Sequence, residues 1–351
     1  MSESNGPILK KRGRSVTSRD VAHAAGVSQS LVSLILSDKP GKKIRPETRT
    51  HVLMVASEMG YRPNMQASAM KLKKARAIGL LSLWDPGSFV FPPVVNGLKS
   101  VCDKEGLALT ICTGRSDESG MPDYLSYFLQ NRLDGLVYLS RVGVTRAGVI
   151  ELLQQHRIPF VCAIGAKDLE EVSSVDVDFF LNGRLAAEHL AASGCRYPVM
   201  GIDPLVNYAE KERLEGFLSG CMKTGIHASY LIPWEVGEAD EPAKERLRRL
   251  LRETPDMDGF VSSTHMSRLI LEAARIEGIR VPEQLKVIAI DNDAYAPYLT
   301  PSLSTVDEPL ESIGRVAGEI LVRRISGNEE VVKAEEPPSL SPRESSRVNT
   351  A

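Results

Sequence analysis

Several polar side chains near the N-terminus have types and spacings that suit contact with nucleic-acid bases. The apolar residues Leu31, Val32 and Ile35 share one face of a predicted helix. Its other faces carry Ser28, Gln29, Ser30, Ser33 and Leu34. A glutamine amide can form a paired hydrogen bond with adenine, and a serine hydroxyl can bond to several bases. This chemistry would let the helix read base edges.

Three short helices are predicted to position these side chains. Thr17 and Asp20 form a near capping box at the start of the first helix, and Gly26 ends that helix. Ser28 is a suitable N-cap for the second helix. The third helix begins at Pro46, and its apolar stripe and terminator are Val52, Val55, Ala56, Met59 and Gly60. A tight turn between the first two helices presents the second to the major groove.

The charge of the chain is divided between its two ends. Residues 1–76 carry 15 Lys and Arg against 5 Asp and Glu, whereas the whole chain carries 43 against 45. A basic head on an acidic body is typical of a nucleic-acid-binding module joined to an unrelated domain. A solvated basic tail without a partner is the alternative that charge alone leaves open.

The composition excludes several classes of protein. The chain has 351 residues, of which 42% are hydrophobic and 25% charged, so two or three domains with a sizeable core are expected. No apolar run approaches the ~20 residues of a membrane span, and no secretory signal is apparent. The five cysteines include no CxxC pair, which argues against disulfides or structural zinc and fits a reducing cytoplasm. No metal or other cofactor is expected.

From Ala77 onward, short apolar strands alternate with amphipathic helices. Strands are predicted at Ile78–Leu83, Leu107–Ile111, Leu136–Leu139, Phe160–Ile164, Val199–Ile202, Gly259–Ser262 and Val287–Ile290. Helices are predicted at Leu181–Ala192, Glu210–Thr224, Met266–Glu277 and Leu310–Ile325. This alternation indicates an α/β body with parallel sheets covered on both faces, which bind ligands at the carboxyl ends of their strands.

The motifs of both parts resemble the LacI/GalR family of bacterial transcriptional regulators. In the head they are Thr17–Ser28, Leu31–Leu36, Arg45–Arg49 and Gly60–Asn64. In the body they are Asp134–Leu136, Gly183–Leu190, Glu212–Phe217, Ile279–Pro282, Ala289–Asn292, Tyr298–Pro301 and Arg343–Ser346. The resemblance implies an all-α helix-turn-helix head and a body of two parallel-sheet lobes, joined by three crossings as in type I periplasmic binding proteins, with an effector between them.

The resemblance also implies DNA contacts. Base-reading positions map to Gln29, Ser30 and Leu34, where Leu34 replaces a polar residue and suits a thymine methyl. Phosphate contacts are expected from Thr17, Ser28, Ser33, Lys42 and Arg49. The family's minor-groove hinge helix maps to Ala67, Ser68, Met70 and Lys71. Met70 replaces a wedging leucine, and Ser68 replaces an arginine. A featureless linker is the alternative.

The resemblance maps the family's effector-binding positions to Phe91, Asn207, Arg213, Val261 and Asp291. Arg213 suits hydroxyls, carboxylate or phosphate, and Phe91 suits a ring. A surface ion pair, a cap or a core position is the alternative for these residues. Polar family positions are replaced by Ile164 and Gly165, and by Thr264 and His265. A sugar or related metabolite is expected, while a more apolar ligand or a vestigial pocket stays open.

The sequence therefore predicts an effector-responsive, sequence-specific repressor in the cytoplasm that binds a palindromic operator as a homodimer. Predicted boundaries are 1–62 for the head, with a basic and disordered 1–14, then 63–76 for the hinge, 77–335 for the lobes and 336–351 for a tail. No nucleotide-binding, metalloprotease or serine-hydrolase motif is present, so an enzyme is not expected. A small-molecule enzyme of the sugar or nucleoside type and a non-specific DNA-binding protein are the alternative functions.

Overall fold

The computed structural model describes residues 16–36, 44–61, 75–82, 84–116, 118, 120–140, 147–202, 208–231, 239–291 and 293–347. The chain divides into two compact units, Met1–Lys73, here called the head, and Lys74–Ala351, here called the body. Within the described segments, no helix combines the length and the apolar character needed to cross a membrane.

The head contains α1 (Ser18–Ala24), α2 (Gln29–Leu36) and α3 (Pro46–Glu58). Thr17 and Asp20 form the predicted capping box, and Gly26 has a φ of +67° in the turn before α2. The apolar stripes of the three helices meet in one small core, made of Val21, Ala22, Ala25, Val32, Ile35, Val52, Val55 and Ala56. The three predicted helices are therefore confirmed.

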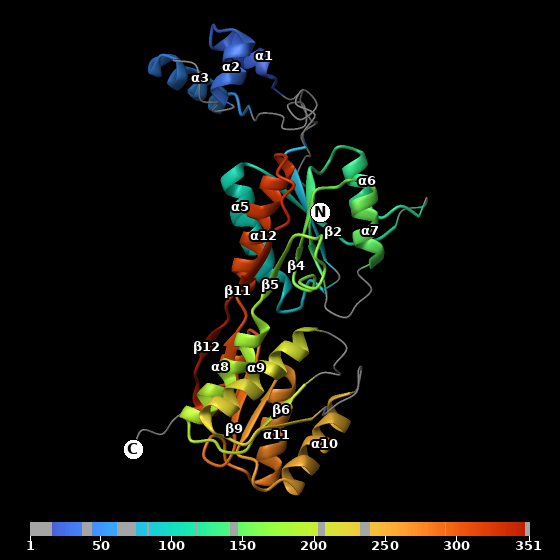
Figure 1. Ribbon diagram of the computed structural model, residues 1–351. Coiled ribbons are helices and arrows are strands. Elements are labelled where there is room, and N and C mark those ends of the chain that lie inside the picture. The colour runs from blue at the N-terminus through green and yellow to red at the C-terminus, as the bar shows by residue number, and fades with distance from the viewer. Residues whose placement is uncertain are drawn as a thin grey trace, which may run out of the picture. The chain divides into compact units, whose positions relative to one another are not determined.

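The first lobe of the body is a parallel sheet with helices on both faces (Figure 1). Its strands in spatial order are β11 (Lys333–Glu336), β5 (Ser174–Val177), β4 (Phe160–Ala163), β3 (Gly135–Leu139), β1 (Ala77–Ser82) and β2 (Ala108–Cys112). One face packs on α5 (Phe91–Glu105) and α12 (Leu310–Ile325), and the other on α6 (Asp123–Leu129) and α7 (Ala147–Gln155).

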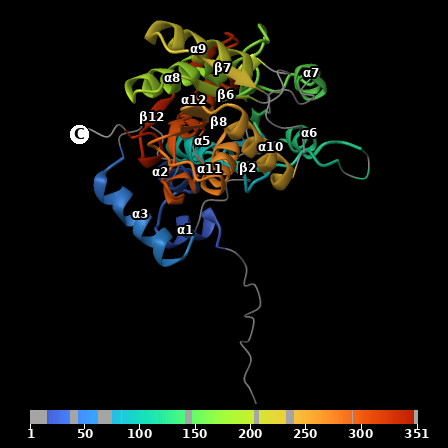
Figure 2. The same cartoon turned by 90° about the horizontal axis from the view of Figure 1, so that it is seen from below.

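The second lobe repeats this plan. Its strands in spatial order are β12 (Ser339–Ser341), β10 (Ser304–Asp307), β9 (Lys286–Ile290), β8 (Gly259–Ser262), β6 (Pro198–Gly201) and β7 (Ser229–Leu231). All pairs are parallel except β12 with β10. Figure 2 shows α8 (Phe179–Ala192) and α9 (Tyr208–Thr224) on one side of this sheet, and α10 (Asp240–Glu253) and α11 (Thr264–Glu277) on the other. The short helices are η1 (Ala296–Tyr298) and η2 (Glu344–Ser346).

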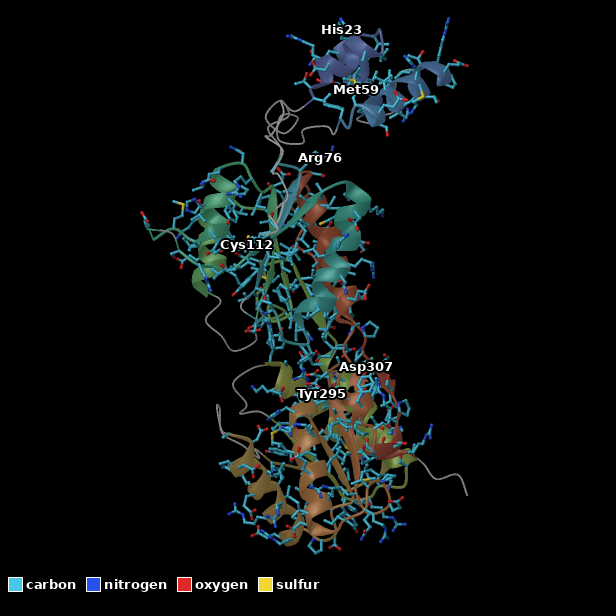
Figure 3. All side chains as sticks on the ribbon, turned by 180° about the vertical axis from the view of Figure 1, so that it is seen from behind. His23, Met59, Arg76, Cys112, Tyr295 and Asp307 are labelled. Atoms are coloured by element: carbon cyan, nitrogen blue, oxygen red, sulfur yellow. The ribbon has the colours of Figure 1, made fainter. Side chains whose placement is uncertain are left out.

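Three crossings join the lobes, as the family resemblance implied. The chain passes between lobes after β5, after β10 and after β11. Figure 3 places Arg76, just before β1, at the end of the first lobe away from the second, and Asp307, at the end of β10, where the lobes meet. The carboxyl ends of the parallel strands therefore face the junction between the lobes, which is where ligands of such sheets bind.

The ends of the predicted elements differ in instructive ways. The predicted strand Phe160–Ile164 stops at Ala163 because Ile164 has a φ of +60°, outside the extended region. The short strands β5, β7, β10, β11 and β12 were not predicted. Residues 336–351 were separated as a tail, yet β12 and η2 lie in this segment and pack into the second lobe through Ser345 and Ser346, which are fully buried.

Two of the sequence motifs have direct structural roles. The Asp134 carboxylate accepts backbone hydrogen bonds from Ala75 at 2.7 Å and from Arg76 at 2.6 Å, so it fixes the start of β1. A Cβ atom on Gly183 of α8 would lie 1.9 Å from the carbonyl oxygen of Arg213 in α9. Only glycine lets the two helices approach this closely, and that approach sets the position of Arg213.

Candidate functional site

The head presents one polar face and buries the other. Gln29, Ser30 and Ser33 of α2 are exposed, while Val32 and Ile35 on the opposite face are fully or almost fully buried. Of the residues proposed from the sequence to contact DNA, Gln29, Ser30 and Ser33 therefore lie on the accessible side of α2. Leu34 is half-buried, and Arg49 of α3 is exposed.

Hydrogen bonds already orient several of these side chains. The Gln29 amide donates to Ser18 Oγ at 2.9 Å, and the hydroxyls of Ser28 and Ser30 lie 2.9 Å apart. Ser28 also accepts from the backbone of Leu31 at 3.2 Å, which makes it the N-cap of α2. The Thr17 hydroxyl donates to Asp20 at 2.7 Å. Thr17 and Ser28 thus have capping roles in addition to the phosphate contacts expected of them.

Some predicted site residues lie outside the described residues. They are Lys42, Ala67, Ser68, Met70, Lys71 and Asn207.

At the junction of the lobes, Arg213 is paired with two carboxylates. Its guanidinium forms ion pairs with Glu210, one turn earlier in α9, and with Glu308, in the crossing after β10, at 2.6 Å. The same group lies 4.7 Å from the centre of the Phe179 ring. The arginine side chain is 18% exposed and the Glu308 side chain 6%. Burial alone would lower the pKa of Arg213, but the two glutamates raise it above its usual value.

Asp291 lies at the end of β9, with 8% of its surface exposed. One carboxylate oxygen accepts hydrogen bonds from the backbone and the hydroxyl of Thr264. Burial, together with the charge of Glu308, raises the pKa of Asp291 to about 7 despite these bonds. Its φ of +133° is strained for a residue with a side chain, and such strain collects at ligand sites.

A second group of polar contacts ties α9 to the first lobe. The Tyr208 hydroxyl donates to Asp176 of β5 at 2.6 Å, and Gly165 donates to the same carboxylate oxygen at 2.7 Å. Lys167 pairs with Glu212 of α9 at 2.8 Å and with Glu335 of β11. Burial raises the pKa of Asp176, which is fully buried. These contacts bridge the lobes and hold their relative angle.

The other predicted effector residues are arranged differently. Phe91 begins α5 and is half-buried against the core of the first lobe. Val261 is fully buried in the core of the second lobe, against residues of α8 and α9. The structure thus brings together Arg213 and Asp291, which are coupled electrostatically. It gives Val261 a packing role.

Comparison with known protein families also divides the chain into a head and a body. Residues 17–64 match the model for bacterial regulatory proteins of the lacI family, and residues 187–346 match that for a periplasmic binding protein-like domain. The chain thus carries a lacI-family head and a periplasmic-binding-protein-like body. It is therefore a transcriptional regulator with a helix-turn-helix DNA-binding head and an effector-binding body.

Relatives of this regulator match it over nearly their full length. The HTH-type transcriptional regulator DegA of Bacillus subtilis (strain 168) is 28% identical, covering 94% of this chain and 98% of the relative. The HTH-type transcriptional repressor PurR of Edwardsiella ictaluri (strain 93-146) is also 28% identical, with 90% and 92% covered. Both are described as regulators and neither as an enzyme.

Two solved structures resemble this regulator throughout. The complex of the transcriptional regulator CelR with cellobiose has a TM-score of 0.65 at 26% identity, covering 94% of this chain and 99% of the other. The Lac repressor dimer bound to operator and the anti-inducer ONPF has a TM-score of 0.72 at 21% identity, covering 95% and 99%. The second likeness concerns the fold.

Sequence reasoning did not select four residues of the junction in this regulator, Glu308, Glu210, Asp176 and Tyr208. Asp176 lies in β5, and Glu308 directly follows β10, and neither strand was predicted because each is short and half polar. The signal available was position, since both residues lie at or near the carboxyl end of a strand.

Proposed function

We propose that this regulator is a repressor whose two heads, in a dimer, bind the two halves of a palindromic operator. The observation that carries the proposal is the exposed polar face of α2 in a head of the LacI family. Gln29, Ser30 and Leu34 would read base edges in the major groove. A dimer fits an operator with two-fold symmetry because each half-site then meets an identical head.

The contacts that set the register of each head are part of the same proposal. Thr17, Ser28, Ser33, Lys42 and Arg49 would contact phosphates, which position the helix without reading sequence. Ala67, Ser68, Met70 and Lys71 would form a hinge helix in the minor groove. An isolated helix of this length is unstable in water, so it would fold only against DNA and its twin in the second subunit.

The junction between the lobes would hold the effector. Asp291 supports this role because it is buried at the carboxyl end of β9, where polar groups bind ligands, and Arg213 of α9 is half-buried and coupled to it. An effector that prefers one lobe angle would change operator affinity by shifting the dimer between two states. A coupling free energy of about 1–3 kcal/mol corresponds to a change of roughly 5- to 150-fold.

The assembly would be a cytoplasmic homodimer. The segment after Ile325 contains Pro337 and Pro338 and few leucines, so it lacks the heptads of a tetramerising coiled coil. The mass in solution should be that of two chains, and a tetrameric mass would contradict this part of the proposal.

Selection from a pool of random duplexes tests the operator proposal. The full-length protein is expected to enrich one sequence with two inverted half-sites. Enrichment of a single, asymmetric half-site would exclude the dimeric mode, and no enrichment at all would favour non-specific DNA binding.

A further inference from the structure

A pocket at the junction is lined by acidic and apolar groups. Its volume is about 290 Å³, and its lining residues are Phe89, Pro93, Glu308, Pro309, Leu310, Glu311 and Ser312. The lining includes two carboxylates and an aromatic ring but no lysine, arginine or histidine. A small organic molecule fits this volume, and the lining favours one with an apolar body.

Glu308 has an oxygen available to a ligand in this pocket. Its side chain is only 6% exposed, and its Oε1 accepts from Arg213. No described residue donates a hydrogen bond to Oε2 of Glu308. A carboxylate oxygen without a protein donor can accept a hydrogen bond from a ligand that carries an N–H group.

The charges around Glu308 are unbalanced. Arg213 is shared between Glu210 and Glu308, and Asp291 is electrostatically coupled to both Arg213 and Glu308. Oδ1 of Asp291 accepts both bonds from Thr264, while no described residue donates to Oδ2. Three carboxylates therefore surround a single guanidinium.

The neighbouring cations are engaged elsewhere. Lys167 pairs with Glu212 and Glu335. Arg315 donates to Ser312 and pairs with Glu319. The N-terminus of α12, which would attract an anion, already has Glu311 in its first turn. An anionic ligand would be repelled by this excess negative charge, whereas a cation would neutralise it.

We propose that the junction binds an effector that carries a positive charge, an ammonium or guanidinium group held by Glu308 beside the Phe89 ring. This inference rests on the proposed role of the junction as the effector site and specifies its ligand class. Glu308 is then the residue that determines specificity. It occupies Arg213 from within the chain, so this arginine does not select a carboxylate or phosphate. An amino sugar and a simple amine both meet the requirement.

Calorimetric titration of the full-length protein with size-matched amines, alcohols and carboxylates on several carbon skeletons tests the proposal. The tightest ligand is expected to be an amine, preferred over the carboxylate of its own skeleton by about tenfold or more, as a charge-assisted hydrogen bond would give. A tightest ligand that is neutral or anionic, or no binding by any amine, would overturn it.

Two variants identify the group responsible. Glu308→Gln keeps an oxygen for Arg213 but removes the charge, so the preference for the amine should fall to about twofold or less. Glu319→Gln, which is also on the α12 side but outside the pocket lining, should keep it. An undiminished preference in Glu308→Gln would contradict the assignment, and heat-melting curves of both variants check that each is folded.

Operator affinity measured with and without the best ligand separates this inference from the proposed function. An amine that binds but leaves operator affinity unchanged contradicts the effector role of the junction and preserves the ligand class. A neutral or anionic compound that changes operator affinity from this site preserves the effector role and contradicts the ligand class.

Discussion

The head and the lobe junction use their polar residues in opposite ways. On α2, Gln29, Ser30 and Ser33 are exposed, and Gln29 and Ser30 form short-range contacts with neighbouring serines. At the junction, Arg213 and Glu308 are buried and bonded to each other across 95 residues of chain. A binding partner reaches the first set directly, whereas it must enter an existing network of charges to reach the second.

This difference indicates how binding at the two places is controlled. DNA contacts by α2 would need little rearrangement, so their strength should depend on base sequence and salt. Ligand contacts at the junction would change the bonds between the lobes, namely Tyr208 with Asp176 and Lys167 with Glu212. Binding there would thus be tied to conformation, as the proposed effector role requires.

The largest effect is expected from removing the central cation of the junction. Arg213→Ala would leave Glu210 and Glu308 buried without a counter-charge, so the free energy of unfolding should fall by about 3–5 kcal/mol. The response to effector should also be lost. Thermal and urea unfolding measure the stability change.

The matched control is Arg249→Ala, which removes an exposed arginine from the surface pair with Glu253. This substitution should lower the free energy of unfolding by less than about 1 kcal/mol. Equal stability losses in the two variants would remove the contrast between buried and exposed charges.

Asp291→Asn should change how stability depends on pH. The pKa of Asp291 is raised to about 7 in the folded chain by burial, among Thr264, Glu308 and Arg213. The folded chain therefore holds a proton that the unfolded chain releases above its usual carboxyl pKa. Stability falls as pH rises through this window, by roughly 4 kcal/mol in full.

The asparagine variant cannot ionise, so its gain in stability over the unsubstituted protein should be much larger near pH 8 than near pH 5. Unfolding curves at the two pH values measure the change. Asp256→Asn, an exposed carboxyl, is the control and should alter neither value. A gain that is the same at both pH values would show that ionisation of Asp291 is not the cause.

In the head, Gln29→Ala should weaken operator binding by about 1–3 kcal/mol through one base position in each half-site. Titrations on the selected operator and on operators altered at that position make the test. The variant should be insensitive to the altered base. An equal loss on every sequence would make Gln29 a phosphate contact.

The smallest effect is expected at the start of α1. Thr17→Ala removes the hydroxyl of the capping box and should destabilise the head by about 1 kcal/mol. Thr17→Ser should restore most of this loss. A change in melting of the body without one in the head would contradict the local role of Thr17.

The sequence predicted the parts of the molecule whose causes are local. The capping box of Thr17 and Asp20, the turn at Gly26 and the start at Pro46 each depend on residues within one helical turn. The strands with continuous apolar runs, such as β3 and β9, were predicted for the same reason.

The junction could not be predicted in the same way because its contacts join distant segments. Arg213 and Asp291 were selected through the family resemblance, and they do lie at the junction. Glu308 and Asp176 were not, since β5 and β10 are short and carry polar residues at alternate positions. Val261 was selected, but strand alternation turns its side chain into the lobe core.

Competition between the selected palindrome and a scrambled duplex of equal length tests the central claim most directly. The account predicts that the full-length protein prefers the palindrome by about 10³-fold or more at physiological salt. Equal affinity for the two duplexes, or none for either at low salt, would contradict it.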